Sequence, residues 1–375
     1  MWNYSQPVKI IFGNGQVEEI KNLMNIEGWE NGLIVAAPNF ISSGLTTKLM
    51  EESKGRLTAV FADFSPNPDV VEVDACAALI RKNGHGCVVA LGGGSAMDLA
   101  KAAASSALAG DSIRDYHGTG KALPPEHLPL IALPTTAGTG SEVTCVSVLT
   151  DHELGKKVPI VSENFYPDYA VIDPELTYSM PSYVTACSGM DVLAHAIEGY
   201  WSKAHQPICD ACAIQAIRLA LKYLYRAFTN PNDAEAREKM CEASLIAGLA
   251  FTLPKTTSAH ACSYPLTNIY GIAHGEACAL TLDYFMRVNA ENDDGRMREL
   301  AQALGYDDMF GLADTISGLK QKLQLRCDMK DFKLSKEKID ELVQTSHHPN
   351  MLNNPVTITD DILYDMYNKL AEIIN

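Results

Sequence analysis

The sequence predicts an α/β domain followed by an all-helical domain. Over residues 1–181, apolar runs of strand length alternate with helical runs, which is typical of a parallel sheet covered on both faces. From residue 182 onward, apolar residues recur at helical spacing, as in 207–228 and 233–253. The length of 375 residues is enough for two such domains. We therefore predict a parallel-sheet domain over 1–181 and a helical domain over 182–375, with the active site in the cleft between them.

The predicted strands and helices alternate regularly through the first domain. Helices are expected over 45–54 and 69–82, and a further helix of small residues follows residue 94. The strand-length runs cover 8–12, 32–38, 58–61, 86–91, 128–133 and 171–174.

The composition excludes several classes of partner. A formal net charge of −16 disfavours nucleic acids and anionic membrane surfaces, because both attract basic proteins. No apolar run is long enough to span a membrane, and the N-terminal residues lack the pattern of a signal peptide. Ten irregularly spaced cysteines predict reduced thiols rather than a disulfide framework. We predict a cytoplasmic protein that acts on a small molecule, with no nucleic-acid or membrane partner.

Three consecutive glycines follow the predicted strand 86–91. Gly92, Gly93 and Gly94 let the backbone approach a bound group closely, and the helix that begins there offers unpaired amides to a pyrophosphate. The run is not the G-x-G-x-x-G fingerprint, so taken alone it could equally be a tight turn. A second loop, 134–144, is rich in small and hydroxyl-bearing residues and follows the strand 128–133. Two such loops at neighbouring strand ends favour dinucleotide binding.

A carboxylate and an imidazole stand four residues apart in the predicted helix 189–200. This spacing places Asp191 and His195 side by side on one helix face. Three imidazoles and one carboxylate result when His260 and His274 are added, and such a set suits a divalent ion of the first transition row. Spacing alone leaves open that Asp191 is a capping residue and that the histidines are ordinary core or surface residues.

The segment that carries the last two histidines should not form one continuous helix. Pro265 and Gly271 interrupt it, so both imidazole rings can turn back toward the same point.

These motifs extend along nearly the whole chain. Their combination and their order resemble those of the metal-dependent, group III iron-containing alcohol dehydrogenases. The resemblance implies an N-terminal nucleotide-binding domain and a C-terminal helical domain, with one Fe²⁺ or Zn²⁺ per subunit in the cleft. Glycerol dehydrogenases and dehydroquinate synthases resemble the same fold, but their metal-site pattern differs from the Asp-x-x-x-His found here. The motifs that carry the resemblance are 92–95 with Asp98 and Lys101, 134–144, 189–200 and 260–275.

The resemblance also implies a set of site residues. The metal ligands would be the four residues already selected by spacing, Asp191, His195, His260 and His274. NAD(H) is favoured over NADP(H), and a homodimer or larger homo-oligomer is expected. Asn67 could instead be only a turn residue between two prolines. The implied cofactor-binding residues are Asn67, Gly93, Gly94, Ser95, Asp98, Thr135, Thr136, Thr144, Lys157 and Leu176.

The expected reaction is the reversible, NAD(P)H-dependent reduction of a short aldehyde to its primary alcohol. The metal would stabilise negative charge on the carbonyl or alkoxide oxygen while the nicotinamide C4 delivers or accepts hydride. A general short-chain alcohol dehydrogenase is one alternative. A non-catalytic nucleotide-binding protein of the same fold is another, and the complete metal quartet argues against it. Lyase or synthase chemistry on a sugar phosphate is a third.

Two positions depart from the family pattern. Ala37 stands where many NAD-preferring members have an aspartate that would repel a 2′-phosphate, so the use of NADPH stays open. Tyr264, four residues after His260, replaces a second histidine near the nicotinamide. A phenol with an ordinary pKa near 10 is a poorer proton relay at neutral pH, and it could also simply fill space.

The run before His260 predicts an anion site. Lys255, Thr256 and Thr257 stand where relatives tend to have small apolar residues and glycines, and a solvated surface is the alternative. If the run is helical, these residues lie about a turn from the metal. We therefore predict an anionic two-carbon aldehyde, such as sulfoacetaldehyde or phosphonoacetaldehyde, with Phe251 and Tyr264 beside its carbon chain.

Overall fold

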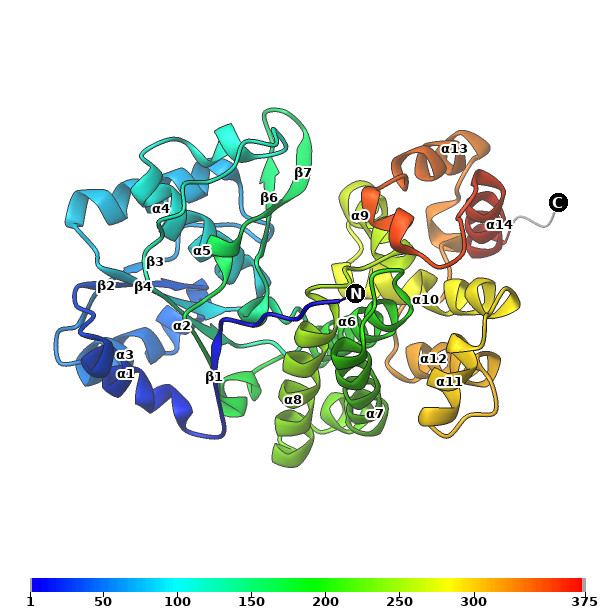
Figure 1. Ribbon diagram of the computed structural model, residues 1–375, viewed down its shortest axis with the longest axis horizontal. Helices are drawn as coiled ribbons and strands as arrows, with labels where there is room; N and C mark the ends of the chain where they lie inside the picture. The colour runs from blue at the N-terminus through cyan, green and yellow to red at the C-terminus, as the bar shows by residue number, and fades with distance from the viewer. Residues whose placement is uncertain (1, 373–375) are drawn as a thin grey trace. The chain divides into compact units, whose positions relative to one another are not determined.

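The computed structural model describes residues 2–372, which form two compact units (Figure 1). The first, called the sheet unit below, comprises Ser5–Thr136 and Gly140–Tyr178. The second, called the helical unit, comprises the described chain from Ser179 onward together with Ala137–Thr139 and residues 2–4. The main passage between the units, after Tyr178, lies close to the division predicted after residue 181.

The sheet unit is built on six parallel strands in the order β1-β8-β5-β4-β2-β3. The inner strands β2, β4, β5 and β8 are buried along their whole length, whereas the edge strands β1 and β3 are partly exposed. This burial explains why the inner strands are apolar throughout, and the predicted parallel sheet is confirmed. The strands are β1 (Lys9–Phe12), β2 (Gly32–Ala36), β3 (Leu57–Phe61), β4 (Cys87–Gly92), β5 (Leu130–Pro134) and β8 (Tyr169–Ile172).

Helices cover both faces of this sheet (Figure 1). Alternate side chains of β2 point to opposite faces, so Leu33 packs with α4 (Val70–Asn83) and α5 (Gly94–Ala109). Its neighbour Ile34 packs with α1 (Ile20–Glu27) and α3 (Leu45–Glu52). The short helix α2 (Pro38–Ser42) follows β2 directly.

A separate antiparallel hairpin was not predicted from the sequence. It pairs β6 (Val146–Asp151) with β7 (Lys156–Val161). Burial alternates along β6, and β7 is mostly polar or half-exposed, so neither strand has the continuous apolar run that marks the main sheet.

The direction of the strand order reverses between β2 and β4. The chain leaves β2 toward the edge strand β3, then crosses back to β4 and continues in the opposite direction to β5. Ligands of open parallel sheets bind outside the carboxyl ends of the strands at such a reversal point. Ala37 follows β2 there and Gly93 follows β4, and the Ala37 amide donates to the Leu91 carbonyl at 3.4 Å.

The helical unit contains nine α-helices in its described part, as its apolar periodicity predicts. The helix α6 is buried along most of its length, and α7, α8, α9 and α10 pack against it. Within residues 2–372, no helix combines the length and the apolar character needed to cross a bilayer. The helices are α6 (Ser182–Trp201), α7 (Pro207–Thr229), α8 (Ala234–Phe251), α9 (Ser258–Tyr270), α10 (His274–Glu291), α11 (Arg296–Ala303), α12 (Met309–Lys322), α13 (Lys336–Thr345) and α14 (Asp360–Ala371).

One detail of the prediction for this unit was wrong. Pro265 does not interrupt the chain, because α9 continues through it to Tyr270 at the loss of one helical hydrogen bond. Gly271, in the left-handed conformation with φ 69°, ends α9, and α10 begins at His274.

Candidate metal centre and cofactor loops

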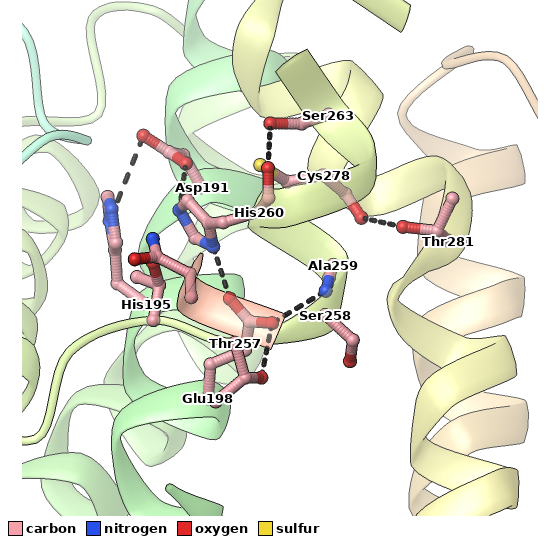
Figure 2. A network of polar contacts seen from close by, with 12 residues as sticks. Asp191, His195, Glu198, Thr257, Ser258, Ala259, His260, Ser263, Cys278 and Thr281 are labelled. Carbon is pink, nitrogen blue, oxygen red and sulfur yellow. Dashed lines mark hydrogen bonds and ion pairs between the residues drawn. The ribbon is translucent and has the colours of Figure 1, made fainter. Parts of the chain in front are cut away.

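The four residues selected by spacing converge in the helical unit. Figure 2 shows three of them, Asp191, His195 and His260. Asp191 and His195 lie one turn apart on α6, with 3.8 Å between Asp191 Oδ2 and His195 Nδ1. From α9, His260 Nε2 lies 3.6 Å from Asp191 Oδ1, and from α10, His274 Nε2 lies 3.8 Å from the same oxygen. The imidazole ring of His260 lies between the other two, 4.5 Å from that of His195 and 5.4 Å from that of His274.

A glycine lets α10 approach α6 closely enough to form this cluster. A Cβ atom added to Gly275 would lie 2.1 Å from the Cys187 carbonyl oxygen and 3.1 Å from Asp191 Cβ. No side chain fits in that space. Gly275 therefore allows the first turn of α10 to set His274 beside Asp191.

The donor atoms of the cluster fit a divalent metal ion. Asp191 Oδ1, His195 Nδ1 and His260 Nε2 are buried and have no hydrogen-bond partner among the described residues. Leaving one buried polar atom unpaired costs about 1–3 kcal/mol, so three such atoms facing one another indicate a missing partner. Carboxylate oxygen and imidazole nitrogen are ligands that Fe²⁺ and Zn²⁺ accept.

The electrostatics favour the metal-binding forms of Asp191 and His195, whereas burial is outweighed at His260 and His274 by the neighbouring Cys278 and carboxylate groups, which raise the pKa of both imidazoles. Burial opposes the charge of Asp191, but the neighbouring imidazoles outweigh it and hold the pKa of the carboxyl well below its usual range. Burial lowers the pKa of His195 to about 4, so this imidazole is neutral at pH 7. An ionised carboxylate and a neutral imidazole are the forms that coordinate a metal.

Glu198 is a functional residue that the sequence reasoning missed. It is fully buried, and His260 Nδ1 donates a hydrogen bond to it, which leaves Nε2 of that ring facing Asp191 (Figure 2). The carboxylate also accepts from Thr257 Oγ1 at 2.6 Å and from the Ala259 amide at 2.7 Å. Such a carboxylate behind a ligand histidine fixes the ring orientation and raises its basicity. The available signal was its position seven residues after Asp191, on the same helix face.

Cys278 is the second residue that the sequence reasoning missed. Its donor atom and those of Asp191, His260 and His274 all lie within 4.8 Å of one another. It follows His274 by four residues on α10, the same spacing that had drawn attention to Asp191 and His195.

In the sheet unit, hydrogen bonds at the first predicted cofactor loop link three of the predicted cofactor residues, Ser95, Asn67 and Lys157. Gly93 is the N-cap of α5, whose first turn includes Gly94 and Ser95. The Asn67 amide donates to Ser95 Oγ at 3.1 Å, and Lys157 Nζ donates to Asn67 Oδ1 at 3.0 Å. Asn67 has a φ of 58°, so it forms a left-handed turn and also holds the lysine.

The second loop lies directly beside the first. The Thr135 amide donates to the Gly92 carbonyl at 3.0 Å. A Cβ atom on Gly93 would come within 3.2 Å of Thr136 Oγ1, which shows how closely the two loops approach. The amide-rich start of α5 and two threonine hydroxyls therefore gather at the carboxyl ends of β4 and β5, as an arrangement for binding phosphate requires.

Two other predicted cofactor residues, Asp98 and Thr144, form hydrogen bonds within the protein. Asp98 accepts from the Val148 amide at 3.1 Å, and the Thr144 hydroxyl accepts from Lys101 Nζ at 3.2 Å. Lys101 is fully buried and also donates to the Ser141 carbonyl at 2.7 Å. Asp98 and Thr144 thus help to shape the second loop from behind.

Leu176 lies apart from these polar residues. It is buried in the short 3₁₀ helix Pro174–Thr177 and belongs to the apolar cluster on the α1 and α3 face of the sheet. Ala37 packs against the same cluster. The structure therefore places Leu176, one of the implied cofactor-binding residues, and Ala37 on one side of the sheet.

Sequence comparison identifies the family. The family described as "Iron-containing alcohol dehydrogenase" matches residues 7–174, and "Fe-containing alcohol dehydrogenase family, C-terminal" matches residues 185–371. The chain belongs to the iron-containing alcohol dehydrogenase family. It is an oxidoreductase of the alcohol dehydrogenase and aldehyde reductase type.

Individual relatives of this alcohol dehydrogenase differ in their named activities. The crystal structure of sulfoacetaldehyde reductase from Bifidobacterium kashiwanohense in complex with NAD⁺ is similar at 60% identity and a TM-score of 0.98, with 100% of each chain covered. Alcohol dehydrogenase 4 of Schizosaccharomyces pombe is 35% identical over 94% of this chain and 85% of its own length. NADPH-dependent butanol dehydrogenase of Clostridium saccharobutylicum is 30% identical, covering 94% of this chain and 95% of its own.

Two aromatic residues predicted to contact substrate lie next to the cluster that Asp191 and the three histidines form in this dehydrogenase. The ring of Phe251, at the end of α8, stacks on that of His195 with centroids 4.1 Å apart. Tyr264 lies one turn beyond His260 on α9, with its ring 6.3 Å from that of His274 and 4.7 Å from that of His348. Burial raises the pKa of Tyr264 to about 12, so the phenol remains a neutral hydrogen-bond donor.

The predicted helical geometry of the anion site was wrong, because α9 begins only at Ser258. Thr256 Oγ1 accepts from Asn350 Nδ2 at 2.8 Å, and the fully buried Thr257 hydroxyl bonds Glu198. Lys255 is half-buried, has a φ of 68°, and donates from Nζ to the Thr252 carbonyl at 2.9 Å. The two threonines therefore make contacts inside the protein, and Lys255 is the only residue of this run that is not buried.

Proposed function

We propose that this dehydrogenase reduces a short anionic aldehyde to its alcohol with NADH, reversibly, and that sulfoacetaldehyde is the leading candidate. The observation that carries the proposal is the 60% identity over the whole chain to a sulfoacetaldehyde reductase whose structure holds NAD⁺. A specific aldehyde reductase is thereby favoured over a general short-chain alcohol dehydrogenase.

We propose that Asp191, His195, His260 and His274 hold one divalent ion, Fe²⁺ or Zn²⁺. The unpaired, buried donor atoms of three of these residues support that assignment. When bound, the ion supplies Lewis acidity to the carbonyl oxygen and the reduced nicotinamide supplies hydride. Phe251, stacked on His195, would bound the space for the carbon chain. Tyr264, a neutral phenol, would donate a hydrogen bond to the reacting oxygen rather than act as a base.

For the cofactor, we propose that the pyrophosphate lies at the start of α5, against Gly93, Gly94 and Ser95, with Thr135 and Thr136 beside it. The close approach of the two loops and the unpaired amides of a helix start support this placement. Lys157, held by Asn67, would contact a ribose. Ala37 offers no carboxylate to repel a 2′-phosphate, so this position does not discriminate between the two cofactors. We propose NADH as the preferred cofactor on the basis of the NAD⁺-bound relative alone.

For the anionic head of the substrate, we propose Lys255. The Lys255 amide donates to the Phe251 carbonyl at 2.8 Å, which ties the lysine one turn beyond the aromatic ring on His195. The hydroxyls of Thr256 and Thr257 are engaged elsewhere. The Lys255 ammonium donates to the Thr252 carbonyl, but it carries the positive charge of this run and has further N–H groups to donate. We further propose a cytoplasmic homodimer or larger homo-oligomer, an expectation that sedimentation would test.

The experiment compares one anionic and one neutral aldehyde. A charge-assisted contact contributes roughly 1.5–3 kcal/mol, so Lys255→Ala should lower kcat/KM for sulfoacetaldehyde at least about tenfold and change that for propanal little. Lys222→Ala, on the exposed side of α7 in the same unit, is the matched control and should affect neither. Equal losses on both aldehydes would remove Lys255 from the substrate site. A wild-type enzyme that prefers propanal would instead support a general alcohol dehydrogenase.

A further inference from the structure

The cluster of Asp191 and the three histidines is exposed on the side of His274. The side chain of His274 is 37% exposed, whereas those of Asp191, His195 and His260 are 7% exposed or less. A substrate would therefore reach an ion held here past His274. The residues that lie next to His274 are the ones to search for further substrate contacts.

A fourth histidine lies close to this exposed side. The ring of Tyr264 lies 6.3 Å from that of His274, and the ring of His348 lies 4.7 Å from that of Tyr264. His348 is half-buried, in the segment between α13 and α14. In a two-carbon aldehyde the anionic head is only about 3 Å from the carbonyl carbon, so a group that binds the head must lie near the metal ligands. His348 contributes such a polar group directly beyond the phenol.

The hydrogen bonds of His348 determine which ring nitrogen carries the proton. Nδ1 accepts from the Asn350 amide at 3.2 Å, because His348 is the N-cap of the 3₁₀ helix Pro349–Asn353. A backbone amide can only donate, so the proton of the neutral ring is on Nε2. Burial lowers the pKa of His348 below its usual value, which keeps the ring neutral at pH 7. The Nε2–H group donates to no residue within 2–372, so it is left to donate to a ligand.

Two asparagines hold this histidine segment against the run before α9. Asn350 Nδ2 donates to Thr256 Oγ1 at 2.8 Å, and Asn353 Nδ2 donates to the Thr256 carbonyl at 3.1 Å. Thr256 directly follows Lys255, so the segment that carries His348 lies beside the run that carries the ammonium group. Donors that are held in place before binding lose less conformational entropy when a ligand arrives.

We propose that His348 is a specificity-determining residue whose Nε2–H donates a hydrogen bond to the anionic head of the substrate, beside the Lys255 ammonium. The inference rests on the proposed function, since it needs an anionic aldehyde at the metal. A sulfonate has three acceptor oxygens and can accept from both groups at once. Tyr264, which lies beside both His274 and His348, then serves the reacting oxygen, and His348 serves the opposite end of the molecule.

Two aldehydes and three variants test this donor. His348→Phe keeps a ring beside Tyr264 but has no N–H, so kcat/KM for sulfoacetaldehyde should fall at least about tenfold, mainly through KM, while that for propanal changes little. His348→Gln, whose amide can donate from nearly the same place, should recover most of the loss. His347→Phe is the matched control, because the exposed His347 pairs with Asp360 at 2.8 Å, and it should affect neither aldehyde.

The opposite results would overturn the assignment. Equal losses on both aldehydes in His348→Phe would show that the ring only supports Tyr264. A His348→Gln variant no better than His348→Phe would exclude donation by Nε2. A wild-type enzyme that prefers propanal would defeat the proposed function and this inference together. A preference for sulfoacetaldehyde that His348→Phe leaves intact would defeat only the role of His348.

A crystal structure of the wild-type protein with NAD⁺ and 2-hydroxyethanesulfonate, the alcohol product, needs no variant. It decides the question even if the His348 variants do not fold. A sulfonate oxygen is expected about 2.7–3.2 Å from His348 Nε2. A sulfonate bound away from this nitrogen would refute the inference.

Discussion

The sheet unit and the helical unit prepare their binding sites in opposite ways. At the strand ends of the sheet unit, the polar side chains already satisfy one another: buried Lys101 donates to the Ser141 carbonyl and to Thr144 Oγ1. In the helical unit, Asp191 and His260 keep buried donor atoms without partners. In the first site the polar side chains are already hydrogen-bonded to one another, and backbone amides are the groups left to bind a ligand. The second leaves buried donor atoms unpaired, so its properties should depend on each individual side chain.

The largest effect should follow from removing one of the predicted metal ligands in the helical unit. His260→Ala should abolish metal uptake and lower kcat/KM by at least about 1000-fold, because the Lewis acid contributes several kcal/mol to stabilising the transition state. NADH binding, which depends on the sheet unit, should persist. Metal analysis and NADH fluorescence titration measure the two properties separately. Full activity in a metal-free preparation of the wild type would contradict the mechanism.

An intermediate effect should follow from changing Glu198, which accepts a hydrogen bond from His260. Glu198→Gln preserves the shape but removes the negative charge that orients and polarises His260, so metal affinity should fall about 10–100-fold. Competition with a chelator measures it. Glu276→Gln is the matched control: this buried glutamate on α10 bonds Tyr183 and the Arg326 amide outside the cluster, so its loss should leave metal affinity unchanged. If the two variants bind metal alike, Glu198 serves only the fold.

The smallest effect is expected from a substitution in the sheet unit. Ala37→Asp introduces a carboxylate at the carboxyl end of β2, where the strand order reverses. Repulsion of a 2′-phosphate by about 1 kcal/mol or more should raise the KM for NADPH about fivefold relative to that for NADH. Steady-state kinetics with both cofactors measure the ratio. An equal response of the two cofactors would mean that position 37 does not face the 2′ position.

Local patterns in the sequence were enough to predict the fold class and to select four residues that the structure brings together. The continuous apolar run 86–91 marked a buried parallel strand, and the glycines after it marked the start of α5. Four-residue spacing placed Asp191 and His195 on one face of α6, and separations of 3.8 Å or less join Asp191 to His195, His260 and His274. Each of these patterns lies within one element or at its end, where a fixed helical or strand period relates sequence to geometry.

Contacts between elements were decided only by the tertiary structure. Glu198 and His260 are 62 residues apart in sequence, and no periodicity links them. Cys278 joins the donor group only because Gly275 lets α10 approach α6. Thr257 looked like an anion-binding hydroxyl, yet it lies in the loop before α9 and holds Glu198. The sequence by itself determined which faces of the helices are polar. Close packing decided which of those faces meet, because an approach of a few ångströms depends on side-chain volumes from distant segments.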